Sequence, residues 1–211
     1  MEPTSSALVA VAKAASEVAI PEAMRGYLDK RRRVAFDILI EELRTARVNP
    51  EEAAARDEVA AMFVKFYQAM AQGAAFRNLR LIAKILAHKA ANTTERTDDF
   101  LMWADSIAGL LPEEAVLLAA LHRHYADAKL KKKEPDRIHN QAMTTLQGEL
   151  VGPRKTFATK EQLEATGTAL GRTGFVILVS GWGGGMSFSP APRLDQLATL
   201  ASLDQWADDQ T

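Results

Sequence analysis

The side chains that could carry chemistry in this chain are its four histidines, its carboxylates and a glycine run, because the sequence contains no cysteine. Without cysteine, a disulfide framework, a zinc–thiolate site and a thiol nucleophile are excluded. His122 and His124 are two positions apart, so on a helix they point in different directions. His88 and His139 have no second ligand nearby in the sequence. Transition-metal sites need clustered ligands, and we therefore expect no metal site.

The glycine run is the next candidate, because glycines also build phosphate-binding loops. Gly181-Trp182-Gly183-Gly184-Gly185 is followed by Met186 and Ser187, where a phosphate loop needs Lys and then Ser or Thr. A hairpin turn explains the run better. No serine has the G-x-S-x-G setting of a nucleophile elbow, and no HExxH pattern is present. We expect no catalytic residue and no cofactor, so that the protein is not an enzyme, and an enzyme of unrecognised type is the weaker alternative.

Basic residues form a further group of candidates. Ten Lys and Arg stand against six Asp and Glu between Ala115 and Arg172, a surplus of four. Two short clusters in this region would suit phosphate or DNA contact: Lys129, Lys131, Lys132 and Lys133, and then Arg154 and Lys155. The alternative for both clusters is a solvated loop.

Trp182 lies within the glycine run and is the candidate for a partner contact. An aromatic side chain on a glycine turn either packs back on its own domain or anchors another protein. The sequence leaves both readings open.

Composition describes an ordinary soluble globular chain of 211 residues, 47% hydrophobic, with a formal net charge of −1. The start, MEPTSS, lacks the basic region of a secretory signal, and the apolar stretch over residues 7–20 is too short to span a bilayer. We therefore expect a cytoplasmic protein with no membrane partner. The near-zero net charge argues against a protein that binds nucleic acid through its overall charge. This net charge is nevertheless a cancellation between a basic middle region and an acidic tail.

Apolar residues recur with a helical period through most of the chain. The β-branched apolar segment over residues 175–179 predicts a strand. Asn49-Pro50 begins a helix that runs to Gly73, and Thr159 with Gln162 forms a capping box for another. Some helices carry two apolar stripes, which is typical of helices packed between neighbours or between chains. The pattern predicts helices over residues 7–18, 22–47, 49–73, 76–86, 100–111, 112–128, 136–151 and 160–170, strands over 175–179 and 186–189, and a last helix from Pro190 or Pro192.

The last ninety residues resemble a winged-helix domain. Leu163 through Leu170-Gly171 to Gly174-Phe175-Val176 is similar to the passage from a third helix into the wing. Ser187-Phe188-Ser189-Pro190, followed by Leu194 and Leu197, is similar to the step from the wing to the next helix. We predict a mostly α protein with one short β-hairpin: a helical bundle over residues 1–111 and a winged-helix-like domain over residues 112–211.

The first part also resembles bacterial proteins of unknown function in which a helical bundle precedes a winged-helix-like end. The residues that carry this resemblance are Lys30-Arg31-Arg32-Arg33 with Ile38 to Leu43, and Phe76-Arg77-Asn78-Leu79-Arg80 with the residues that follow. The resemblance implies an architecture and no function.

A winged helix that binds DNA presents basic or amide side chains on its third helix. The corresponding segment here places Glu161 and Glu164 among its outward positions, and these carboxylates oppose phosphate. Our first hypothesis is therefore a non-catalytic bacterial protein that acts through protein–protein contacts or self-association. The alternative is a DNA-binding transcriptional regulator that uses the winged-helix-like domain and the basic clusters.

Overall fold

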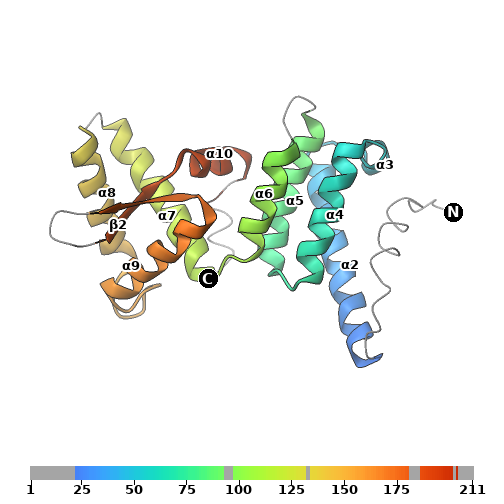
Figure 1. Cartoon of the computed structure of the whole chain (residues 1–211), viewed down its shortest axis with the longest axis horizontal. Helices are drawn as coiled ribbons and strands as arrows, with labels where there is room; N and C mark the ends of the chain where they lie inside the picture. Colours follow the sequence, from blue (N-terminus) through green and yellow to red (C-terminus); the bar gives the residue numbers. More distant parts are fainter. Residues whose placement is uncertain (1–21, 93–96, 132–133, 181–185, 202, 204–211) are drawn as a thin grey trace. The chain divides into compact units, whose positions relative to one another are not determined.

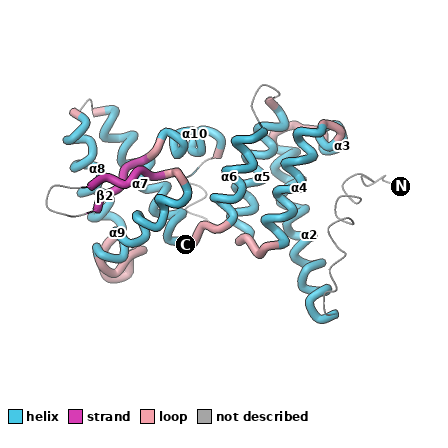
Figure 2. Tube along the Cα trace, in the orientation of Figure 1, coloured by secondary structure: helices cyan, strands magenta, loops and turns pink. Residues whose placement is uncertain are grey.

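The computed structural model describes residues 22–92, 97–131, 134–180, 186–201 and 203 (Figure 1). The described residues form nine α-helices and one short antiparallel hairpin, and 77% of these residues are helical (Figure 2). This confirms the predicted mostly α class with a single hairpin near the C-terminus. The helix predicted over residues 7–18 lies outside the described residues. In the described part, no helix is both long and apolar enough to cross a membrane.

The chain divides into two compact units, residues 1–109 and residues 110–211. The division lies two residues before the domain boundary predicted from the sequence. Each unit is described below by itself.

Unit 1 is a helical bundle arranged around one apolar helix. It contains α2 (Glu22–Thr45), α3 (Pro50–Ala54), α4 (Asp57–Ala71), α5 (Phe76–Ala91) and α6 (Thr97–Ala108). Helix α5 packs against α2, α4 and α6, so it is covered from several sides. Its core residues Leu79, Ile82 and Leu86 are completely buried. The apolar periodicity of this segment is what makes it the centre of the unit.

The helix predicted from Asn49 to Gly73 is wrong in one respect, because the structure breaks it into α3 and α4. Asn49 caps α3 as predicted, and its Oδ1 accepts a hydrogen bond from the N–H of Glu51 at 3.0 Å. The break comes at Arg56, whose backbone is extended (φ −93°, ψ 122°). The Arg56 guanidinium donates to the carbonyl of Ala90 at 2.5 Å, near the end of α5. A contact between positions so far apart in the sequence cannot be seen in local periodicity.

Unit 2 is built around α7 (Pro112–Leu130), which packs against most other elements of the unit. Its neighbours include α8 (Pro135–Leu150), α9 (Lys160–Ala169), α10 (Pro192–Leu200) and strand β2 (Met186–Pro190). A 3₁₀ turn, η1 (Leu170–Thr173), leads from α9 into strand β1 (Val176–Ser180). The order of two helices, a capped helix, a hairpin and a helix is the one that the winged-helix resemblance implies. The resemblance itself stays a prediction.

Strands β1 and β2 pair antiparallel, with Leu178 opposite Phe188 at the centre of the hairpin. Thr159 caps α9 as predicted, since its Oγ1 accepts from the N–H of Gln162 at 3.4 Å, but the return bond of the predicted capping box is shifted by one residue. The side chain of Gln162 in turn accepts from the N–H of Ala158 at 2.9 Å. Gly174 has the left-handed conformation (φ 72°) that lets the chain leave η1 and enter β1.

Candidate protein–protein interface

Strand β2 is held in unit 2 by an unusually close contact with α9. The ring of Phe188 is buried and lies against Gly167, so close that a Cβ atom there would be 2.1 Å from Cε1 of the ring. Only glycine leaves room for this contact. A large apolar side chain therefore packs the hairpin against α9, and β2 is the strand in contact with this helix.

A chain of hydrogen bonds fixes the neighbouring residue of β2. Ser187 Oγ is 2.9 Å from Nε2 of His139 in α8, and Nδ1 of that histidine is 2.5 Å from the hydroxyl of Tyr125 in α7. Burial raises the pKa of Tyr125 to about 12, so this hydroxyl stays protonated at neutral pH. The chain ties β2 to two helices. The sequence did not reveal it, because its members are 14 and 48 positions apart.

An ion pair fixes η1, the segment that delivers the chain into β1. The carboxylate of Glu114 is buried at the start of α7. Both terminal nitrogens of Arg172 donate hydrogen bonds to it, at 2.5 and 2.8 Å. The backbone N–H of Leu111 donates to the same carboxylate at 2.9 Å. Burial alone would raise the pKa of Glu114, but the hydrogen bonds from Arg172 and Leu111 outweigh it and hold the pKa below its usual value.

Strand β1 is attached through β2 and η1, and three successive apolar side chains on it are exposed. Ile177 is 49% exposed, Leu178 40% and Val179 38%. Residues 176–179 make no backbone hydrogen bond to described residues other than those of the hairpin. In the part of the chain that the structure describes, nothing pairs with the edge of β1 that faces away from β2, and apolar side chains lie beside this edge. Such an edge is a template for pairing with another strand.

The described basic candidates do not form one patch. Lys129 and Lys131 lie at the end of α7, before α8 begins, whereas Arg154 and Lys155 follow the end of α8. A helix of 16 residues, about 24 Å long, separates the two groups. Lys132 and Lys133 lie outside the described residues, as does the predicted partner contact Trp182.

Two of these basic side chains already have partners within unit 2. Lys129 Nζ lies 3.5 Å from the carboxylate of Asp195 in α10, and Lys155 donates to the carbonyl of Gly148 in α8. Lys131 and Arg154 are exposed. Arg154 also has the left-handed backbone conformation (φ 68°), which is uncommon for a residue with a side chain.

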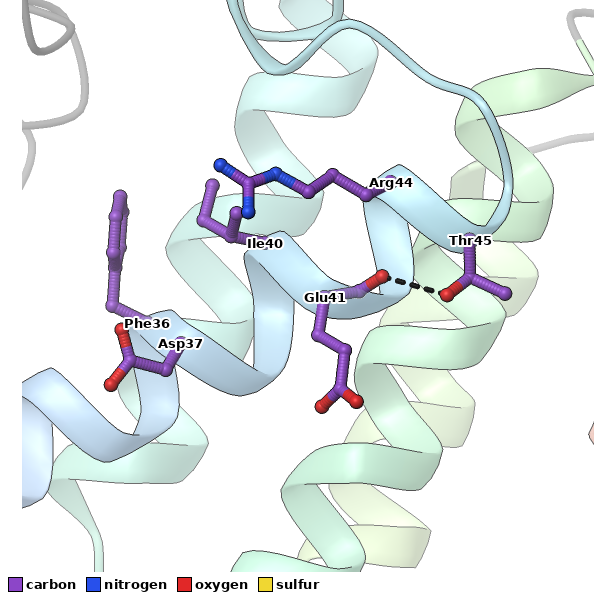
Figure 3. Close-up of a pocket in the computed structure, with 6 residues that line it drawn as sticks. All are labelled: Phe36, Asp37, Ile40, Glu41, Arg44 and Thr45. Atoms are coloured by element: carbon purple, nitrogen blue, oxygen red, sulfur yellow. Dashed lines mark hydrogen bonds between the residues drawn. The ribbon is translucent and has the colours of Figure 1, made fainter.

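Unit 1 carries a pocket on the outer side of α2, and all of its lining residues come from that one helix (Figure 3). Phe36 is 44% exposed, while Asp37, Glu41 and Arg44 bring charges of both signs. The hydroxyl of Thr45 donates to the carbonyl of Glu41, so it is used within the helix. A shallow surface of mixed charge on a single helix has no converging polar groups, unlike a ligand site.

The described residues show no metal centre, since nowhere among them do three or more His, Asp or Glu side chains gather as ligands would. No family model, no curated protein and no solved structure matches this chain.

Proposed function

We propose that this protein is a non-catalytic interaction protein that associates through the β1 edge of unit 2. The observation that carries the proposal is the run Ile177, Leu178 and Val179, three consecutive exposed apolar side chains on a strand whose outer edge pairs with no described residue. Edge strands of soluble proteins are usually protected by charges, proline or a covering element. Strand β1 has the sequence VILVS and contains neither a charged residue nor a proline.

The bracing of the hairpin supports the same proposal. Phe188 against Gly167, Ser187 bonded to His139 and Arg172 bonded to Glu114 hold β2 and η1 in place. A strand presented on a rigid support loses less conformational entropy when it binds, which favours association.

DNA binding is the second candidate function, and the placement of the basic residues gives it less support. The exposed Lys131 and Arg154 are separated by the length of α8, and α9 carries Glu161 and Glu164. Sequence-independent DNA binding needs several cations that reach neighbouring phosphates together.

Sedimentation velocity of the full chain over a range of concentrations tests the proposal. We expect the average mass to rise reversibly with concentration, and we expect Ile177→Lys to reduce the rise at least tenfold in apparent affinity, because the change places a charge on the edge. Met102→Lys is the matched control, since Met102 is an apolar side chain of similar exposure (38%) on α6. A wild-type chain that stays monomeric at every concentration would contradict the proposal.

A further inference from the structure

The occupant of the β1 edge can be inferred from the strand itself, if the proposed association through this edge is correct. We infer that it is the β1 strand of a second copy of this chain, paired antiparallel across a two-fold axis. The two hairpins would then form one four-stranded sheet.

Charge is the first argument for a second copy. All five residues of β1, from Val176 to Ser180, are uncharged. A charge on a partner strand would find no opposite charge on any residue of β1. A second β1 brings only apolar and small polar residues to this edge, so the two surfaces match.

Symmetry is the second argument, because an antiparallel strand pair is self-complementary about a two-fold axis. The axis stands perpendicular to the sheet and passes between the two strands, midway between the two copies of one residue. All five residues of each strand pair only if that residue is Leu178, the middle of β1. Any other axis leaves residues of the strand unpaired.

This register makes a specific set of neighbours. Leu178 lies opposite Leu178 of the second copy, and Ile177 lies opposite Val179 of the second copy on the other face of the sheet. β-Branched side chains such as Ile and Val pack well against neighbours on the pleated surface of a sheet. The three exposed apolar side chains of each copy, Ile177, Leu178 and Val179, therefore all acquire apolar neighbours.

The interface is small, since it consists of one five-residue strand from each copy. Contacts of this size belong to the weak, reversible class, and we expect a dissociation constant of about 10–100 μM. The association is therefore adjustable by protein concentration.

Disulfide trapping in the full chain tests the register, and the absence of native cysteine removes any background. Residues directly opposite in an antiparallel pair have Cα atoms about 4.5–5.5 Å apart, within the range of a disulfide. We expect Leu178→Cys to form a covalent dimer on mild oxidation. We also expect a mixture of Ile177→Cys and Val179→Cys to cross-link more than either variant alone. Phe36→Cys, with a similarly exposed side chain on α2, is the control and should cross-link no faster than random collision allows.

The outcomes separate this inference from the proposed function. If the wild-type chain associates and Ile177→Lys abolishes association, but Leu178→Cys does not cross-link, the edge binds in another way and the inferred register is wrong. If Ile177→Cys alone cross-links best, the axis is displaced and the register is again wrong. If the chain never associates, both the proposed function and the inference fail.

Hydrogen exchange provides an independent readout that a disulfide cannot bias. The amide protons of β1 that point away from β2 should exchange more slowly as the protein concentration rises. If they are equally slow in a dilute, monomeric sample, the edge is covered by a segment of the same chain, and a second copy is not its occupant.

Discussion

At the scale of single residues, the most informative group is the buried carboxylate of Glu114. Its side chain is 3% exposed, whereas that of its partner Arg172 is 49% exposed. The pair therefore lies at the boundary between the interior of unit 2 and water. The contribution of such a pair becomes visible when one partner is removed, because the charge of the other partner is then left without an opposite charge.

We predict that Glu114→Gln lowers the free energy of unfolding by about 2 kcal/mol at neutral pH, less than for a fully buried pair because water still reaches Arg172. The pKa of Glu114 is lower in the folded state than its usual value of 4.5. The stabilisation is therefore complete above the pKa of the unfolded state and is lost as the pH falls through the lower, folded-state pKa. Urea unfolding of the wild type and the variant across this pH range measures the difference.

The control for this prediction is Glu164→Gln. Glu164 pairs with Lys160 at 3.2 Å on the surface of α9, and both side chains are more than a third exposed. We expect this change to cost less than about 0.5 kcal/mol. If the two substitutions cost the same, or if the difference between wild type and Glu114→Gln does not shrink in acid, the buried ion pair does not have the stabilising role described.

At the scale of elements, the packing of α9 on β2 determines where the hairpin lies. We predict that Gly167→Ala destabilises the protein by about 2 kcal/mol, because the added Cβ would overlap the ring of Phe188, which is itself buried. This cost exceeds the benefit that alanine normally brings to a helix. Thermal and urea unfolding monitored by circular dichroism measure the change.

Gly148→Ala is the control, and it should change the stability in the opposite direction. Gly148 lies within α8, and a Cβ atom there would meet nothing within 4 Å. We expect this variant to be more stable than the wild type by about 0.5–1 kcal/mol, because alanine favours the helix and nothing opposes it. If Gly167→Ala also stabilised the protein, the contact between α9 and β2 would be looser than described.

Local pattern predicted the elements well where the signal lies in neighbouring residues. The caps at Asn49 and Thr159 and the β-branched run of β1 each needed only a few residues of sequence. What the sequence could not show are contacts between distant positions. Arg56, at the break, donates to the carbonyl of Ala90, and Ser187 is hydrogen-bonded to His139.

The candidate interface divides in the same way. The β-branched apolar composition identified β1 as a strand, but it could not show that Ile177, Leu178 and Val179 remain exposed. That exposure depends on which strand α9 and α7 cover, and the contacts show that they cover β2. The count of charges between Ala115 and Arg172 combines the two basic clusters into one basic region, yet the length of α8 separates their described members. A count of charges along the sequence does not show how far apart the charged side chains lie in the folded unit.

At the scale of the whole molecule, the two units each have their own apolar core. Unit 1 buries Leu79, Ile82 and Phe100, and unit 2 buries Leu117, Phe175 and Phe188. Cores of this kind allow a domain to fold alone. The interface proposed here lies wholly within unit 2, so the assembly should be a property of that unit.

We predict that a fragment of residues 110–211 folds cooperatively by itself and associates as the full chain does, whereas residues 1–109 fold and stay monomeric. Circular dichroism melting and sedimentation velocity measure both properties. A folded 1–109 fragment that associates as the full chain does, or a folded 110–211 fragment that does not, would move the interface out of unit 2.

The start of the second fragment matters, because the N–H of Leu111 donates to the buried carboxylate of Glu114. A fragment that begins at Pro112, the boundary predicted from the sequence, lacks this donor and places a positive amino terminus at the positive end of α7. Both changes weaken the beginning of the helix on which unit 2 is built. We therefore expect the 112–211 fragment to be less stable than the 110–211 fragment by about 1–2 kcal/mol in urea unfolding, and equal stability would place the boundary at 112 after all.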